Sequence, residues 1–364
     1  MAKPKKYRIE NKDYFAWEYE EQTKIKHKVI SAYSKIWLSK VGFRKNTIFF
    51  DCHGGCGAYV EKNNVFYGST ILVNKIAESL NAKRGSKTAF IYCEIDKENF
   101  DNFQKVIEDA KPTKIKSFNE NFENVLNNNI IKKYYNQYPT LFFIDPFGYN
   151  LNIFSCQNLL NNWGNEIIIN FMFDFINRFI SEPSTEPCYN NFFGTDEWKK
   201  ANEMTGLKRE TFLVDLYKKK IKEITKAKYV FAYRLCYPNK NQTYYYLIHL
   251  TNHIDGITLM KESFASINNG RVEYLGKNNN VLSLFDLTPL KAKEMYDYKL
   301  KQYRGKSITF HQLWESIVEE TAYTSKDLNL TLQELEKMNI VEVSRISSKR
   351  CSYKEDDIIT FLEV

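Results

Sequence analysis

The sequence predicts an α/β protein with a mainly parallel sheet, an antiparallel hairpin at one edge of that sheet, and a second, small domain. Five short apolar runs alternate with helical patterns, which is typical of a parallel sheet covered on both faces. Two β-rich runs at 229–237 and 243–250 flank the turn PNKNQ and predict the hairpin. Short helices and strands in the last 60 or so residues predict the second domain.

Composition places the chain among ordinary globular proteins. It has 364 residues, 43% hydrophobic and 26% charged, enough for two cores and too apolar for wholesale disorder. Lys and Arg exceed Asp and Glu by 52 − 44 = +8, which is compatible with nucleic-acid binding. The seven cysteines show no paired framework, and no apolar run is long enough to cross a membrane. We therefore expect a soluble, cytoplasmic protein with free thiols.

The elements of the first domain, 22–267, follow in order. We expect a loosely held N-terminal arm over 1–21, then an amphipathic helix at 23–41, where apolar residues recur three and four apart. The first strand, 47–51, leads through a glycine-rich loop and a polar stretch to a helix at 69–80. Further strands are predicted at 88–95, 114–118, 139–144 and 166–173, with helices between them.

The glycine loop after the first strand contains Gly54, Gly55 and Gly57. Glycine lets the backbone approach a ligand and adopt positive φ, and the following helix start offers free N–H groups. The loop therefore predicts a site for a nucleotide-like small molecule. A tight turn without a ligand is the alternative.

Polar residues close four of the predicted strands: Asp51, Glu94, the stretch 119–121 and Asp145. In an open parallel sheet the carboxyl ends of the strands border one crevice, where ligands bind. A carboxylate after the second strand can accept both hydroxyls of a ribose. Either Glu94 or Asp96 could do so, and we favour Glu94 because it is nearer the strand end.

The sequence Asp145-Pro146-Phe147-Gly148 fits methyl transfer to an exocyclic amine of a base. A carboxylate and a neighbouring backbone carbonyl can accept the two amine hydrogens and so aim the nitrogen lone pair. Proline stiffens the backbone that presents the carbonyl, and Phe147 can stack on the base. The alternative is that Asp-Pro begins a turn and Phe147 belongs to the core.

A linker and connecting helix are expected at 268–300, followed by the second domain at 301–364. Helices at 308–319, 325–329 and 331–338 and strands at 340–346 and 357–362 resemble a winged helix, a module that often binds DNA. Arg345, Lys349 and Arg350 are the candidates for phosphate contacts. A solvated wing, or a role in protein contacts, is the alternative.

Taken together, these features resemble the Rossmann-like class I S-adenosylmethionine-dependent methyltransferase fold. More narrowly, the chain resembles the three-Cys-motif partner (TcmP) family, named after a neighbouring three-cysteine protein. The resemblance covers most of 22–265, and DPFG is also similar to the motif of tRNA guanine-N2 methyltransferases. The matching stretches are KHKVISAY (26–33), FFDCHGGCGAY (49–59), YGST (67–70), FFIDPFGYN (142–150) and IIINFMFDFINRF (167–179).

The resemblance implies S-adenosylmethionine as cofactor and assigns roles to the residues already singled out. Asp51 and the three glycines would border its methionine part, Glu94 its ribose and Asn121 its adenine. Related enzymes usually have an aspartate in place of Asn121, and small apolar residues in place of Cys52 and His53. Asp145, Pro146 and Phe147 would hold the target amine. Lys26 and His27 are a family feature without a role that the residues explain.

The leading hypothesis is a methyltransferase acting on DNA or RNA, with a three-Cys-motif protein as a further partner. A second hypothesis is a non-catalytic adaptor of the same fold that binds nucleic acid or that partner, for example in phage defence. A third is a metal-dependent nuclease using Asp51, Glu94 and Asp145. We expect no metal site, because Cys52, His53 and Cys56 lack a second ligand pair at zinc-site spacing.

Overall fold

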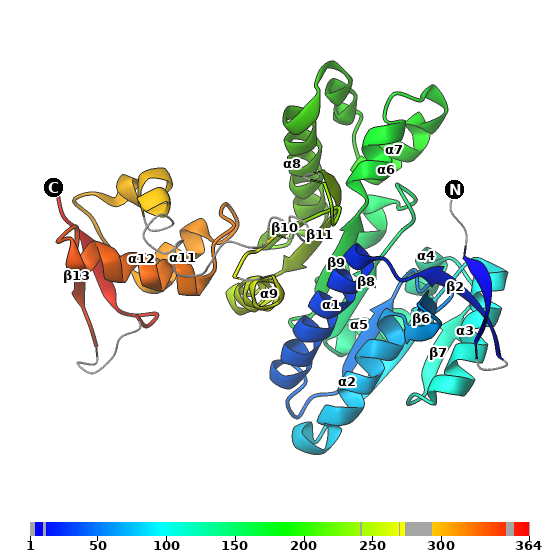
Figure 1. The fold of residues 1–364 in the computed structure, drawn as a ribbon. Coiled ribbons are helices and arrows are strands. Elements are labelled where there is room, and N and C mark those ends of the chain that lie inside the picture. The colour runs from blue at the N-terminus through cyan, green and yellow to red at the C-terminus, as the bar shows by residue number, and fades with distance from the viewer. Residues whose placement is uncertain are drawn as a thin grey trace.

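The computed structural model describes residues 4–9, 12–240, 242–268, 270–273, 293–346 and 353–363. Its centre is a seven-stranded sheet in the order β10-β11-β9-β8-β3-β6-β7 (Figure 1). β3, β6, β7, β8 and β9 are mutually parallel, whereas β11 is antiparallel to both β9 and β10. This confirms the predicted parallel sheet and its closing hairpin. The strands are β3 (Thr47–Asp51), β6 (Thr88–Cys93), β7 (Ile115–Phe118), β8 (Thr140–Ile144), β9 (Glu166–Phe171), β10 (Tyr229–Cys236) and β11 (Thr243–Thr251).

Both faces of the sheet are buried because successive side chains of each strand enter different hydrophobic layers. Phe49 pairs with Phe90, and both face the layer formed with α1 (Glu21–Lys40), α2 (Ser69–Arg84) and α9 (Ile254–Ile267). Phe50 and Phe142 face the opposite layer. A slip of one residue would exchange the two layers, so burial on both sides fixes the register.

Helices on the second face connect β7 to β8, β8 to β9 and β9 to β10. The long connection after β9 supplies buried aromatic residues such as Tyr189 and Tyr217. No helix among the described residues has the length and apolarity needed to cross a bilayer. The elements are α4 (Phe122–Asn127), α5 (Asn129–Gln137), η1 (Ile153–Cys156), α6 (Phe173–Phe179), η2 (Pro183–Thr185), α7 (Glu186–Phe193), η3 (Glu197–Glu203) and α8 (Gly206–Thr225).

A second sheet near the N-terminus corrects two expectations. β1 (Lys5–Ile9), β2 (Lys12–Glu18), β4 (Ala58–Glu61) and β5 (Asn64–Tyr67) form a four-stranded sheet in the order β1-β2-β4-β5. It packs through Ala16 and Val60 on Phe103 of α3 (Lys97–Ala110). The segments expected as a loose arm and a polar loop are therefore largely strands. β1–β2 and β4–β5 are local hairpins, but the β2–β4 pair that joins them into one sheet is distant in sequence, so local pattern could not reveal it.

The C-terminal elements form a three-stranded antiparallel sheet in the order β12-β14-β13, with two helices between β12 and β13. One helix spans the segment where we expected two. Leu328, Leu332 and Leu335 are buried on one face of it, because their spacing of three and four residues matches one continuous α-helix. β12 was not expected. The elements are η4 (Leu300–Tyr303), β12 (Ser307–Thr309), α11 (Phe310–Ile317), α12 (Ser325–Lys337), β13 (Val341–Ser344) and β14 (Ile358–Phe361), and residues 293–298 are also helical.

These C-terminal elements pack against α9 and the β10 edge. The buried Lys261 Nζ donates to the backbone oxygen of Thr321 at 2.5 Å. Glu319 Oε1 accepts the N–H of Val230 at 2.7 Å, which caps part of the edge of β10. One hydrophobic layer runs without interruption from α1 to β14.

Candidate active site

The carboxyl ends of the parallel strands border a cavity of about 270 Å³. Loops after β3, β6 and β7 form one side, and the segment after the DPFG sequence forms the other together with α7. Two of the predicted cofactor residues, Glu94 and Asn121, line it. The full lining is Cys52, His53, Glu94, Ile95, Glu120, Asn121, Phe122, Glu123, Tyr149, Asn150, Leu151, Asn152, Cys188 and Asn191.

The glycine loop joins β3 to β4 beside this cavity. Gly55 and Gly57 have φ of +65° and +74°, the left-handed region that favours glycine. A Cβ on Gly57 would lie 2.4 Å from Phe103 Cδ2, and one on Gly54 would lie 2.0 Å from Tyr92 Cε2. A Cβ on Gly55 would meet no described atom within 4 Å. Gly54 and Gly57 are thus required by packing on the protein's own rings, and Gly55 by its backbone conformation.

Glu94 ties the glycine loop to the end of β6. One carboxylate oxygen accepts the N–H of Gly55 at 2.9 Å, and the other accepts the N–H of Asp96 at 2.8 Å. Burial raises the pKa of Glu94, and these N–H groups offset only part of that rise. A carboxylate has about four acceptor positions, so positions remain for hydroxyl groups. The side chain of Asp96 instead caps α3 by accepting the N–H of Asn99.

Asp51 is fully buried at the end of β3. Its Oδ2 accepts hydrogen bonds from Ser69 Oγ at 2.5 Å and Thr70 Oγ1 at 2.7 Å, at the start of α2. Its Oδ1 has no hydrogen-bond partner among the described residues. Burial raises the pKa of Asp51 to about 6, although both hydroxyl groups lower it. The residue thus anchors α2 and keeps one oxygen for another donor.

Asp145 lies at the end of β8 between two donors. Lys26 Nζ is 2.5 Å from Oδ2, and Asn170 Nδ2 is 2.5 Å from Oδ1. The side chains of Lys26 and Asp145 are 8% and 19% exposed. Burial raises the pKa of Asp145, but the charge and hydrogen bond of Lys26 and the hydrogen bond of Asn170 outweigh it, so the pKa lies below its ordinary value. The carboxylate is therefore ionised, and each of its oxygens accepts a hydrogen bond from within the protein.

The two residues after Asp145 differ in exposure. Pro146 is buried, whereas Phe147 is 42% exposed. The ring of Phe147 packs edge-on against Phe175 with 5.3 Å between centroids. Phe147 is therefore a surface ring beside the carboxylate, and the alternative that placed it in the core is wrong.

His53 lies in the glycine loop at the cavity wall. Its ring centroid is 4.7 Å from that of Phe122, and its buried Nδ1 has no partner among the described residues. Burial lowers the pKa of His53 to about 4, with Asp145 opposing the shift. The ring is neutral near pH 7 and has one polar atom unused. Its neighbour Cys52 is buried, and burial raises the pKa of that thiol well above its ordinary value.

Asn121 and the residue after Glu94 frame the other end of the cavity. Asn121 caps α4, because its Oδ1 accepts the N–H of Glu123 at 2.9 Å. Ile95 is 65% exposed and Phe122 is 4% exposed, and both line the cavity. This end thus combines apolar surface with an amide group.

The C-terminal candidates are only partly described. Arg345 forms a two-pronged ion pair with Glu336, at 2.8 and 2.6 Å, and its guanidinium lies 5.1 Å from the ring centroid of Tyr353. Lys349 and Arg350 lie outside the described residues. The structure therefore places one of the three candidates, and that one is engaged within the protein.

The three acids of the nuclease hypothesis are not gathered into one cluster. Asp51, Glu94 and Asp145 are each held by separate donors. Across the described ranges, no group of three or more His, Cys, Asp or Glu side chains is placed to hold a metal ion.

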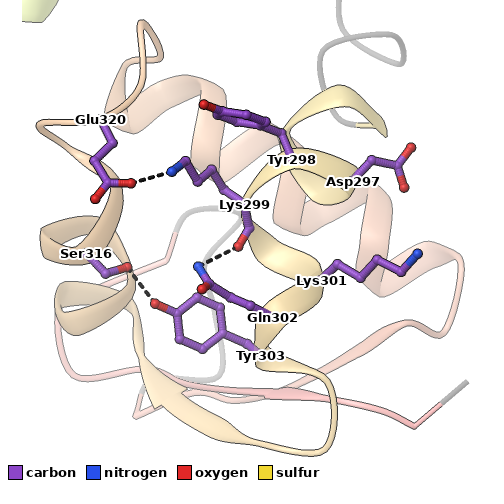
Figure 2. Close-up of a pocket in the computed structure, with 8 residues that line it drawn as sticks. All are labelled: Asp297, Tyr298, Lys299, Lys301, Gln302, Tyr303, Ser316 and Glu320. Atoms are coloured by element: carbon purple, nitrogen blue, oxygen red, sulfur yellow. Dashed lines mark hydrogen bonds and ion pairs between the residues drawn. The ribbon is translucent and has the colours of Figure 1, made fainter.

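A larger hollow of about 530 Å³ lies far from the strand ends, among the C-terminal elements (Figure 2). Its polar groups mostly satisfy one another: Lys299 pairs with Glu320, and Tyr303 Oη donates to Ser316 Oγ at 2.8 Å. Figure 2 shows Lys301 extending away from these pairs. The smaller cavity is lined by His53, whose Nδ1 has no partner among the described residues, and it is therefore the better candidate site.

Comparisons with known proteins give structural likeness only. No protein-family model matches the chain, and no curated protein matches it. A protein from Legionella pneumophila is 13% identical, with 69% of this chain and 94% of that chain covered and a TM-score of 0.43. An rRNA methylase from Streptococcus thermophilus is 10% identical (60% and 93% covered, TM-score 0.31), as is a dimethyladenosine transferase from Plasmodium falciparum (85% and 96%, TM-score 0.30).

The strand order itself is more informative than these scores, all of which are below 0.5. Five parallel strands with β3 in the middle are followed by a hairpin whose last strand, β11, is inserted antiparallel beside β9. The fold is class I methyltransferase-like. In such a sheet the glycine loop after β3 and the acid after β6 flank the same crevice, as the cavity described above shows.

Sequence reasoning missed three parts of this candidate site. Lys26 had no assigned role. Its place among the apolar residues on the buried face of α1 could have indicated that it pairs with a buried acid. Asn170 is the polar residue within the apolar run of β9, a similar signal. Ser69 was expected as a helix cap, but its hydroxyl bonds Asp51. His27 is buried, and its Nδ1 lies 3.0 Å from Tyr19 Oη.

Proposed function

We propose that this chain is an S-adenosylmethionine-dependent methyltransferase that modifies an exocyclic amine of a nucleic-acid base. The observation that carries the proposal is the Asp145 carboxylate. Lys26 Nζ, 2.5 Å away, holds it ionised at the carboxyl ends of the parallel strands that border the cavity, so it can accept hydrogens. A target amine needs such an acceptor.

The residues around the cavity fit the cofactor. Glu94 keeps acceptor positions for ribose hydroxyls, and Ile95 and Phe122 offer apolar surface for an adenine. The unused Oδ1 of Asp51 and the glycine loop would hold the methionine part. Asn121 would contact the adenine through its amide. The bound cofactor would supply an electrophilic methyl group.

The protein's own contribution is positioning. Asp145 and the carbonyl of Pro146 would accept the two amine hydrogens and hold the nitrogen lone pair in line with the methyl group. Phe147 would stack on the base from its exposed position. Lys26 acts through Asp145: it keeps the carboxylate ionised and oriented, so it is a positioning residue.

Calorimetry with S-adenosylhomocysteine, followed by a methyl-transfer assay on RNA and DNA, tests the proposal. We expect saturable cofactor binding by the wild type. Asp145→Ala should retain that binding and lose methyl transfer by more than a hundredfold, because the amine loses its acceptor. Absence of binding at millimolar S-adenosylhomocysteine would overturn the proposal.

Membership of the three-Cys-motif partner family, and a three-Cys-motif protein as partner, belong to the same proposal. So does a winged-helix domain at 301–364, after a methyltransferase domain at 22–267. The order β12-β14-β13, with α11 and α12 between β12 and β13, supports the winged helix. With Arg345 paired to Glu336, Lys349 and Arg350 would carry its phosphate contacts.

One observation favours the adaptor as a second candidate function. Both oxygens of Asp145 are bonded within the protein, to Lys26 and Asn170. If those bonds persist with nucleic acid bound, the chain would recognise its ligand without modifying it. Cofactor binding and nucleic-acid binding that are unaccompanied by methyl transfer would select this alternative.

A further inference from the structure

Basic residues lie along the outer face of α1. This face runs from the candidate active site, at the carboxyl ends of the parallel strands, towards the amino ends of the same strands. Lys28 and Lys35 are exposed and two turns apart, and neither has an ion-pair partner among the described residues. No acidic residue follows Glu21 in this 20-residue helix. The helix begins beside Asp145, which Lys26 contacts, and spans about 30 Å. Its outer face thus carries two exposed lysines and, beyond Glu21, no acidic residue of its own.

The loop after α1 leads into a cluster of exposed rings and cations, here called the aromatic–basic patch: Phe43, Arg44, Lys45 and Trp163. Phe43 is 52% exposed and Trp163 is 57% exposed. The Arg44 guanidinium lies 5.2 Å from the Phe43 centroid, and Lys45 Nζ lies 4.4 Å from the Trp163 centroid. His253 supports Trp163, with Nε2 2.9 Å from its backbone oxygen. The two rings are exposed although the hydrophobic layers lie close by.

Charge is divided unequally along the chain. Residues 301–364 contain 9 basic residues (Lys and Arg) and 11 acidic residues (Asp and Glu). The other 43 basic and 33 acidic residues of the chain lie in residues 1–300. The net charges are therefore −2 and +10. A polyanion would therefore be attracted mainly to the first 300 residues.

We propose that the outer face of α1 and the aromatic–basic patch bind an unpaired nucleic-acid strand whose target base enters the candidate active site. The inference rests on the proposed function and names the form of its substrate. Lysines contact phosphates of any nucleic acid, but exposed aromatic rings stack only on bases that are free of a duplex.

Fluorescence anisotropy with labelled single strands of about 15 nucleotides, as RNA and as DNA, and with the matching duplexes, tests the surface. Wild type should bind single strands more tightly than duplexes. We expect the double variant Lys28→Glu/Lys35→Glu to bind roughly tenfold more weakly and to show a shallower salt dependence. Phe43→Ala/Trp163→Ala should also lose roughly tenfold on single strands, with little change on duplexes.

Two further variants test whether the loss of binding is specific to the α1 surface. Lys105→Glu/Lys114→Glu makes the same change of net charge at exposed positions on and after α3, away from α1, and should cost less than threefold. Lys349→Glu/Arg350→Glu changes the phosphate contacts proposed for the C-terminal domain by the same charge, and its loss should be similar on single strands and duplexes because it removes no exposed ring.

The outcomes separate this inference from the proposed function. Equal losses in the α1 variant and its control would overturn the binding surface, and so would tighter binding to duplexes. Binding of an acidic protein but no nucleic acid would also overturn it. In each case, binding of S-adenosylhomocysteine measured on the same samples reports on the cofactor site alone, and it should be unchanged in all the variants.

Discussion

At the scale of single residues, the buried pair of Lys26 and Asp145 makes a sharp prediction. Lys26→Met leaves the carboxylate buried without its cation, so we expect a loss of about 3 kcal/mol of unfolding free energy at pH 7. Without the ammonium, we expect burial to outweigh the remaining hydrogen bond from Asn170, so that the pKa of Asp145 rises above its unfolded value. The deficit should therefore be larger at pH 7 than near pH 4, where the carboxyl group is protonated.

Urea unfolding at both pH values measures this effect. Lys24→Met is the matched control, because Lys24 lies on the same helix but its ion pair with Glu61 is partly exposed. Its loss should stay below about 1 kcal/mol and vary little with pH. Equal losses of unfolding free energy in the two variants would contradict the prediction that the buried pair of Lys26 and Asp145 contributes more than an exposed one.

The buried Asp51 predicts a different pH dependence. Its folded pKa of about 6 lies above the ordinary value of 3.8, so its contribution to stability is greatest below pH 4 and falls as pH rises to about 6. The difference between these two pKa values corresponds to roughly 3 kcal/mol. Subtracting the unfolding free energy of Asp51→Asn from that of wild type, between pH 4 and 7, should reveal this slope. If the unfolding free energies of the two proteins vary with pH in parallel, the raised pKa of Asp51 in the folded state is contradicted.

At the scale of elements, the sequence predicted those whose pattern is local. The apolar runs of β3, β6, β8 and β9 and the helical spacing of α1 each carry their own period, and all were placed within two residues of their observed ends. The N-terminal sheet was missed because β2 pairs with β4 across some 40 residues. The same holds for the candidate site. The acids at the strand ends could be predicted from local sequence, whereas the contact between Lys26 and Asp145 joins residues 119 positions apart and could not.

The glycine loop, an element recognised from sequence, predicts unequal costs of substitution. Gly57→Ala combines positive φ with a collision on Phe103, so it should lose more than about 2 kcal/mol of unfolding free energy. Gly55→Ala meets only the backbone strain, about 1 kcal/mol. Thermal unfolding measures both. A Gly55 variant as unstable as the Gly57 variant would mean that the loop conformation differs from the one described.

At the scale of the whole molecule, the C-terminal elements are part of the same hydrophobic layer as α1 and α9. Polar contacts reinforce that continuity: Trp314 Nε1 donates to Thr258 Oγ1 at 2.7 Å, and Lys261 is buried against Thr321. A module attached in this way would hold a fixed position relative to the active site. Because the sequence could show only a change of pattern after residue 268, it suggested two separate domains and gave no sign of this contact.

The chain should accordingly unfold as one cooperative unit. Hydrogen exchange measured by mass spectrometry should show α11 and β9 losing protection at the same urea concentration. Glu319→Ala removes the acceptor of Val230 N–H and the partner of Lys222, and should cost about 2 kcal/mol in both segments alike. Glu320→Ala, which removes a more exposed partner of Lys299, is the control and should cost less than about 1 kcal/mol. If α11 loses protection well before β9 in the wild type, the contact is too weak to couple them, and the C-terminal elements are an independently folding domain whose position relative to the active site is not fixed.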